Sequence, residues 1–237
     1  MLVMWFAPFA VFAAVAAAIA KSGPGIFETY AFFMAEFYLG IVILWALLFV
    51  AAFAVLGGRA AALFKAVREP TMLAFATASS EAAYPKTLAQ LEKFGCSNRV
   101  ASFVLPLGYS FNLDGSMMYC TFAVMFIAQA YGIELSAAQQ LTMLLILMVT
   151  SKGMAGVPRA SLVVIAATLA QFNIPEAGLL LLLGIDHFLD MGRSATNVIG
   201  NSVATAVVSK WEGQLRSETD IAADLANAVS TEPPPAA

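Results

Sequence analysis

Residues 186–201 read DHFLDMGRSATNVIGN, and this stretch decides how the rest of the chain is interpreted. Its polar residues are spaced 4, 3, 4 and 4 positions apart: Asp186, Asp190, Arg193, Asn197 and Asn201. On an α-helix these side chains share a stripe roughly 80° wide, and the opposite face is apolar. A charge at mid-membrane costs at least about 2.5 kcal/mol, so we expect this stripe to line a polar cavity inside a protein.

The sequence around this stretch is too apolar for a water-soluble fold. Of its 237 residues, 61% are hydrophobic and 11% are charged, whereas about 25% are charged in an ordinary globular domain. The net charge of −3 and the lack of a basic stripe argue against a nucleic-acid partner. His187 is the single histidine, and Cys96 and Cys120 lack paired spacing, so neither a metal site nor a disulfide framework is expected. We therefore predict an all-α membrane protein in a lipid bilayer, with no cofactor.

Apolar stretches predict where the chain crosses the bilayer, because about 20 such residues span it. The sequence predicts a scaffold-type transmembrane helix in residues 1–25 and a transport domain in 26–211, comprising a span 30–58, a re-entrant hairpin 70–94, a broken span 100–132, a second re-entrant hairpin 138–173 and a span 177–209. Polar or Gly/Pro-containing residues interrupt three of these segments, at 77–81, 112–116 and 151–158. Interrupted segments that recur in this way indicate the substrate site of a transporter.

Basic residues predict the orientation of the chain. Those on one side are Arg59, Lys65, Arg68, Lys86, Lys93, Arg99, Lys210 and Arg216. Lys21 is nearly alone on the other side, so the richer side is predicted to be cytoplasmic. The first hairpin would then enter from the cytoplasm and the second from outside, and their tips would meet near the midplane. The acidic, proline-ended residues 212–237 are predicted to be a disordered cytoplasmic tail.

The charged residues of the last span suit a zwitterion that carries an extra carboxylate. The planar guanidinium of Arg193 can grip a carboxylate, and Asp190, one turn away, can receive an ammonium group. Hydroxyls of Ser79 and Ser80, and a half-helix N-terminus beside Val157, would bind the main-chain carboxylate. The plainer alternatives are an Asp–Arg pair that only locks helices together and serines that only cap a helix.

Oxygen-bearing residues in the broken span suit a small cation. Asn112 and Asp114 are hard ligands, and unwound carbonyls near Gly108 and Asn197 would join them. A polar glycine turn is the alternative for this segment. Glu81, at the first tip, either carries a proton or lies in water. His187 lies beside the polar stripe, where packing is favoured over a proton relay.

These motifs resemble the dicarboxylate/amino acid:cation symporter family, which includes excitatory amino acid transporters and bacterial proton or sodium glutamate symporters. The resemblance extends from Ala7 to Trp211. It rests on four motifs in order, which are Ala78-Ser79-Ser80-Glu81, Asn112-Leu113-Asp114-Gly115-Ser116, Ala155-Gly156-Val157-Pro158 and Asp186 followed by residues 190–197. It implies an elevator-type core that slides through a scaffold assembled as a homotrimer, with the co-transported cation as H⁺ or Na⁺.

Carried over by position, the resemblance implies a set of site residues. Substrate would contact Ser79, Ser80, Leu113, Ser116, Val157, Asp190, Arg193, Ser194 and Asn197, with Asp186 in support. Cation or proton sites would involve Gly108, Ser110, Asn112, Asp114, Ser151, Lys152, Asn197, Asn201 and Glu81. Asp190 favours glutamate or aspartate as substrate, because C4-dicarboxylate members of the family tend to lack a carboxylate there.

Three departures from the family pattern refine this prediction. Asn201 stands where sodium-coupled members have an aspartate, and Met154 stands where they have a threonine, so proton coupling is favoured. The chain also begins at what looks like the fifth span of the family, so its N-terminal scaffold helices are expected to be missing.

The leading hypothesis is a bacterial inner-membrane symporter that imports glutamate or aspartate with protons or sodium. The alternatives are a C4-dicarboxylate:cation symporter of the same fold and a truncated, non-transporting fragment. An intramembrane aspartyl protease built on Asp186 and Asp190 is disfavoured, because Arg193 lies beside the pair and would hinder its acid–base exchange. We therefore expect no enzymatic activity.

Overall fold

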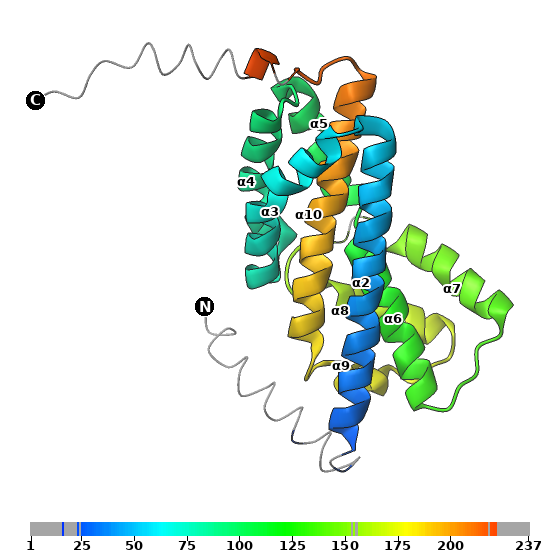
Figure 1. Cartoon of the computed structure of the whole chain (residues 1–237). Helices are drawn as coiled ribbons and strands as arrows, with labels where there is room; N and C mark the ends of the chain where they lie inside the picture. The colour runs from blue at the N-terminus through cyan, green and yellow to red at the C-terminus, as the bar shows by residue number, and fades with distance from the viewer. Residues whose placement is uncertain are drawn as a thin grey trace, which may run out of the picture.

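The computed structural model describes residues 16, 23, 25–152, 154, 156–217 and 219–221, and this part of the chain is all-helical (Figure 1). The predicted all-α class is therefore confirmed. The elements are α2 (Ile26–Leu56), α3 (Arg59–Thr77), α4 (Ser80–Phe94), α5 (Asn98–Phe111), α6 (Asp114–Ala130), α7 (Ala137–Thr150), α8 (Ala160–Gln171), η1 (Glu176–Gly178), α9 (Leu179–Leu182) and α10 (Asp186–Trp211). The helix expected in residues 1–25 lies outside the described residues, except for residues 16, 23 and 25.

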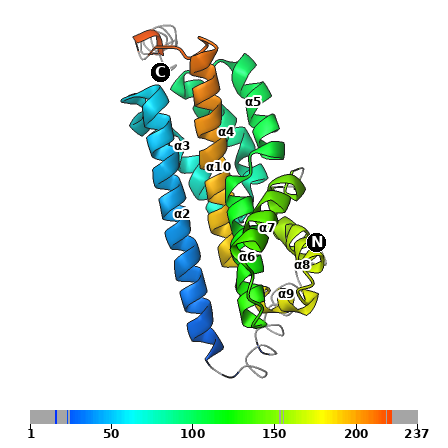
Figure 2. The ribbon, with the colours of Figure 1, turned by 90° about the vertical axis from the view of Figure 1, so that its right-hand side faces the viewer.

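Helix α10 lies at the centre of the molecule and packs against α2, α3, α4, α5 and α6. Figure 2 shows it between α2 on one side and α5 and α6 on the other. In Figure 1, α3, α4 and α5 lie beside the upper half of α10, and α7, α8 and α9 lie lower. Residues 192–203 of α10 are all buried, so the polar stripe and the apolar face are both covered by protein.

Two stretches of the described residues are long and apolar enough to cross a membrane, Ile26–Leu56 and Asn98–Ala130. The 31 residues of α2 correspond to about 46 Å of helix, which exceeds the bilayer core of about 30 Å. One face of α2 packs inward through Phe37 and Ile41, and large apolar side chains such as Phe32 and Leu47 point outward. This division fits a helix between a protein core and lipid.

The helices are interrupted at the three places singled out in the sequence. Ala78 adopts a left-handed conformation after α3, and Ser79 caps α4 by accepting a hydrogen bond from the Ala82 main chain (3.3 Å). Asn112 and Leu113 separate α5 from α6. We call residues 77–81 the first tip, and the described residues of 151–159, between α7 and α8, the second tip.

Two helix boundaries differ from the predicted ones. Helix α3 begins at Arg59 and not at residue 70, because residues 59–69 are mostly good helix formers and Pro70 is accommodated inside the helix. The last span, predicted as continuous over 177–209, is divided by a turn at 183–185. Gly184 weakens the helix there, and Asp186 begins α10 in the first turn, where the helix dipole favours a carboxylate.

The segment after α10 is not disordered from residue 212, as the sequence suggested. The Ser97 main chain donates to Gln214 O (3.2 Å), and the Arg216 main chain donates to Gly95 O (2.9 Å). Arg59 adds a hydrogen bond from its guanidinium to Arg216 O (2.9 Å). The prediction is thus wrong for residues 212–217, because main-chain groups beside Gly95 are free to pair with them. Residues 222–237 lie outside the described residues.

Candidate functional site

A fully buried ion pair forms the core of the candidate site. Arg193 Nε lies 2.7 Å from Oδ1 of Asp190, one turn earlier on α10. The guanidinium also donates from Nη1 to Ser116 Oγ (3.2 Å) and from Nη2 to the carbonyl of Val157 (3.1 Å). A buried ion pair needs such additional hydrogen bonds to offset its desolvation. Arg193 thereby joins α10, the start of α6 and the second tip.

A second guanidinium extends this cluster. The main-chain N–H of Arg159 donates to Asp190 Oδ2 (2.5 Å), and its side-chain Nε lies 3.5 Å from Asp186 Oδ2. Tyr119 donates its hydroxyl proton to Asp186 Oδ1 (2.5 Å). Two carboxylates and two guanidinium groups therefore balance each other's formal charge. The cluster thus contains two Asp–Arg pairs, where the sequence suggested one.

Asn197 connects α10 to the first turn of α6. Its Oδ1 accepts the main-chain N–H groups of Gly115 (2.9 Å) and Ser116 (3.3 Å), and its Nδ2 donates to Ser116 Oγ (2.9 Å). Leu113, at the N-cap of α6, provides no side-chain cap. The amide of Asn197 therefore satisfies N–H groups that a helix start leaves without partners.

The two tips touch each other through Gly156. Ser79 Oγ donates to the Gly156 carbonyl (3.0 Å), and the Gly156 main-chain N–H donates to Glu81 Oε1 (2.9 Å). A Cβ at position 156 would lie 2.4 Å from Ser80 Oγ, so a larger residue would require the Ser80 side chain to move. The serine-rich tip therefore lies against the glycine-containing tip, as expected if both enclose one ligand.

A second polar group surrounds the break between α5 and α6. Asn112 Nδ2 lies 3.2 Å from Asn201 Oδ1 and 3.5 Å from Asp114 Oδ2. Glycines allow the close packing: a Cβ at Gly200 would lie 2.1 Å from Asp114 Oδ2, and one at Gly108 2.3 Å from Asn201 Oδ1. The oxygen atoms proposed as cation ligands therefore come from α5, α6 and α10.

Most of the predicted site residues lie in these contacts, and Ser110, Ser194, Leu113 and Ser151 are among those that do not. Ser110 is exposed and donates to Pro106 O within its own helix (3.3 Å). Ser194 is buried on α10, but its hydroxyl has no hydrogen-bond partner within the part of the chain that the structure describes. Leu113 and Ser151 are both buried, the first at the start of α6 and the second at the end of α7.

Three residues in or beside the cluster were missed by sequence reasoning. Tyr119 and Arg159 both contact Asp186, and Trp45 donates from Nε1 to Thr196 Oγ1 (2.9 Å) on α10. Arg159 could have been recognised from the sequence, because it is a charged residue that directly follows the Gly-Val-Pro of the second tip. The signal for Tyr119 and Trp45 was a hydrogen-bonding ring within an apolar helix, since such rings find partners when buried.

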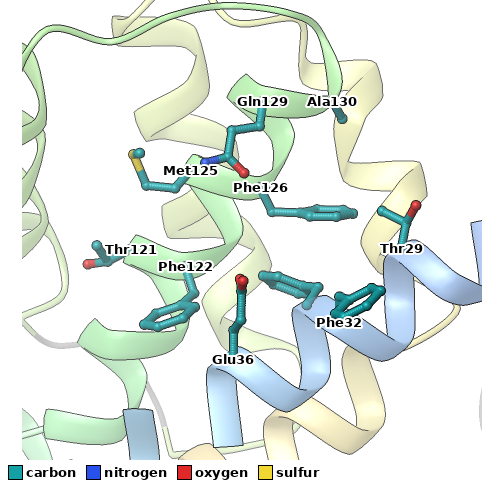
Figure 3. Close-up of a pocket in the computed structure, with 10 residues that line it drawn as sticks. Thr29, Phe32, Glu36, Thr121, Phe122, Met125, Phe126, Gln129 and Ala130 are labelled. Atoms are coloured by element: carbon teal, nitrogen blue, oxygen red, sulfur yellow. The ribbon is translucent and has the colours of Figure 1, made fainter. Parts of the chain in front are cut away.

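The polar cluster is closed, and a cavity lies elsewhere. This cavity has a volume of about 560 Å³ and lies between α2 and α6. Figure 3 shows Glu36 and Gln129 there among the rings of Phe32, Phe122 and Phe126. None of the candidate site residues lines it.

Arg159 provides a direct test of the second tip. Its φ of 65° is left-handed, which costs an L-residue about 1–2 kcal/mol. Arg159→Gly removes this strain and a half-exposed ion pair, so we expect stability to change by less than about 1 kcal/mol. Arg159→Pro cannot adopt this positive φ, because its ring fixes φ near −65°, and it also lacks the N–H that binds Asp190, so it should cost about 3 kcal/mol or more. Chemical unfolding in detergent measures both, and equal stabilities would contradict the left-handed conformation at this position.

Comparison with known proteins identifies a family and several relatives of the chain. Residues 1–211 match the model of the sodium:dicarboxylate symporter family. A Bacillus caldotenax protein named proton/sodium-glutamate symport protein is 46% identical over 223 residues, which cover 91% of this chain and 51% of that protein. The Bacillus subtilis (strain 168) protein of the same name is 41% identical over 90% of this chain and 49% of its own length. A C4-dicarboxylate transport protein of Laribacter hongkongensis (strain HLHK9) is 43% identical over 95% of this chain and 51% of its own length. The chain thus spans about half the length of these relatives.

Proposed function

The chain belongs to the sodium:dicarboxylate symporter family, and on that basis we propose that it imports glutamate or aspartate together with protons or sodium. The family and the names of the relatives are those of transporters and not of enzymes, and membership makes the chain a membrane protein. One observation carries the choice of substrate. The buried pair of Arg193 and Asp190 presents a guanidinium and a carboxylate side by side against the second tip.

Substrate binding would exchange contacts that the closed cluster makes internally. The side-chain carboxylate of the substrate takes the guanidinium hydrogens of Arg193 that now reach Ser116 and Val157. Its ammonium group replaces the N–H of Arg159 at Asp190 Oδ2. The main-chain carboxylate takes donors from the first tip, where Ser79 now donates to Gly156. The first two exchanges replace one charge-assisted hydrogen bond with another, and the third replaces the neutral Ser79–Gly156 bond with a charge-assisted one.

The proposal extends to the mechanism of the assembled transporter. The tips belong to two re-entrant hairpins, and the core of residues 26–211 moves as an elevator within a homotrimeric scaffold. The proposed location is the bacterial inner membrane, with the C-terminus in the cytoplasm. The contact between the tips at Gly156 supports this arrangement, because it joins two segments that lie far apart in the chain.

Asp190→Ala tests the substrate assignment. We expect glutamate and aspartate binding to fall by roughly 100-fold, because a buried charge partner of the ammonium group is lost. Succinate binding should fall much less, since succinate has no ammonium group. Equilibrium binding of labelled substrates to purified protein measures both effects. Glu36→Gln, in the separate cavity, is the control and should leave both affinities unchanged.

The relatives named C4-dicarboxylate transport proteins support a second candidate, a C4-dicarboxylate:cation symporter. Wild-type protein that binds succinate more tightly than glutamate would favour it. Uptake into proteoliposomes with imposed proton or sodium gradients then tests transport. Binding without uptake under either gradient would instead identify a non-transporting fragment.

A further inference from the structure

The break between α5 and α6 forms a site where a positive charge is electrostatically favoured. Helix α5 ends at Phe111, so its last carbonyl groups lack helical partners and carry the negative end of the helix dipole. The Asp114 carboxylate and the Asn201 amide oxygen lie beside this break, where both accept a hydrogen bond from Asn112 Nδ2. Half-helix ends and unwound carbonyls of this kind bind the coupling cations of membrane transporters.

The chain itself supplies a positive charge at this place. Lys152, on the second tip, donates from Nζ to the main-chain carbonyl of Phe111 (2.5 Å). The carboxylate of Asp114, three residues further along the chain than Phe111, carries the opposite charge. Lys152 was expected among the cation ligands, yet an ammonium group has three donors and no lone pair, so its side chain cannot ligate a metal ion.

We propose that the Lys152 ammonium group is a tethered cation that takes the place of a sodium ion at the end of α5. The inference rests on the proposed function and narrows the choice of coupling ion. A fixed positive charge at the end of α5 repels sodium from the oxygen atoms there. Since Lys152 belongs to the second tip, closing that tip delivers the charge to the break. Closure then needs no sodium at this place.

The experiment measures binding of labelled glutamate to the purified chain in sodium chloride and in choline chloride. We expect the wild-type affinity to be the same in both salts. Lys152→Ala should weaken binding roughly 10-fold in choline chloride, and millimolar sodium or methylammonium should restore it. Lys152→Arg keeps the charge and should keep salt-independent binding. Lys86→Ala removes a surface ammonium group that pairs with Glu69, and it should change nothing.

The outcomes distinguish a failure of the proposed function from a failure of the proposed role of Lys152. A wild-type chain that binds neither glutamate nor aspartate contradicts the proposed function. Wild-type binding that requires sodium overturns the inference alone, as does a Lys152→Ala variant whose binding is unchanged or is weakened equally in every salt. If Lys152→Ala does not fold, the wild-type salt comparison together with Lys152→Arg decides the question.

Discussion

Arg193→Ala is expected to abolish substrate binding and to lower the free energy of unfolding by about 3–5 kcal/mol. The substitution leaves the Asp190 carboxylate buried without its charge partner. It also removes the donors to Ser116 and Val157, so α10 keeps its contacts with the second tip only through Arg159. Labelled-glutamate binding and chemical unfolding in detergent measure the two effects separately.

Two further variants distinguish the charge of Arg193 from its shape. Arg193→Lys keeps a positive charge beside Asp190 but loses the planar fork, so we expect weak binding with a smaller loss of stability. The double variant Arg193→Ala/Asp190→Ala should be less destabilised than the sum of the single variants, because no unpaired charge remains. Arg99→Ala, at an exposed position on α5, is the control. Normal glutamate affinity in Arg193→Ala would refute the proposed role.

The periodicity of the last helix predicted which polar residues share a face, because 3.6 residues per turn fixes their angular spacing. The contacts of Arg193, Asp190 and Asn197 with the rest of the chain agree with that stripe. Periodicity carries no information about what faces a stripe across space. The use of Asn197 as a remote cap for α6 therefore could not be predicted from local sequence.

The break in the last span and the ordered segment after α10 were missed because opposing local sequence preferences had to be weighed against each other. A run of apolar residues predicted an unbroken last span, whereas Gly184 and the dipole preference of Asp186 end it at 183–185. Charge and proline content predicted that the segment after α10 is disordered. Instead, two main-chain hydrogen bonds and one hydrogen bond from the Arg59 guanidinium hold residues 214–216. Arg159 and Tyr119 gain their significance only from the position of Asp186, which tertiary packing determines.

Gly115→Ala should destabilise the chain by about 1–3 kcal/mol, the usual cost of overpacking a core. A Cβ at this position would lie 2.2 Å from the Arg193 carbonyl oxygen and 2.8 Å from Thr196 Cβ. Because both atoms belong to the central helix, α6 must shift away from α10. That shift would break the hydrogen bond from the Gly115 N–H to Asn197, so glutamate affinity should fall as well.

The sign of the Gly115→Ala effect is informative because the same change usually favours a helix. Within an open helix, replacing glycine by alanine stabilises by roughly 0.5–1 kcal/mol. Gly58 offers the matched control: it lies directly before α3 with a helical φ of −56°, and its Cβ would meet no atom within 4 Å. Because Gly58 is the N-cap of α3, where glycine is favoured over alanine, we expect Gly58→Ala to cost less than about 1 kcal/mol and Gly115→Ala to cost clearly more, as measured by chemical unfolding. Equal stability of the two variants would show that α6 and α10 do not approach each other as closely as the proposed site requires.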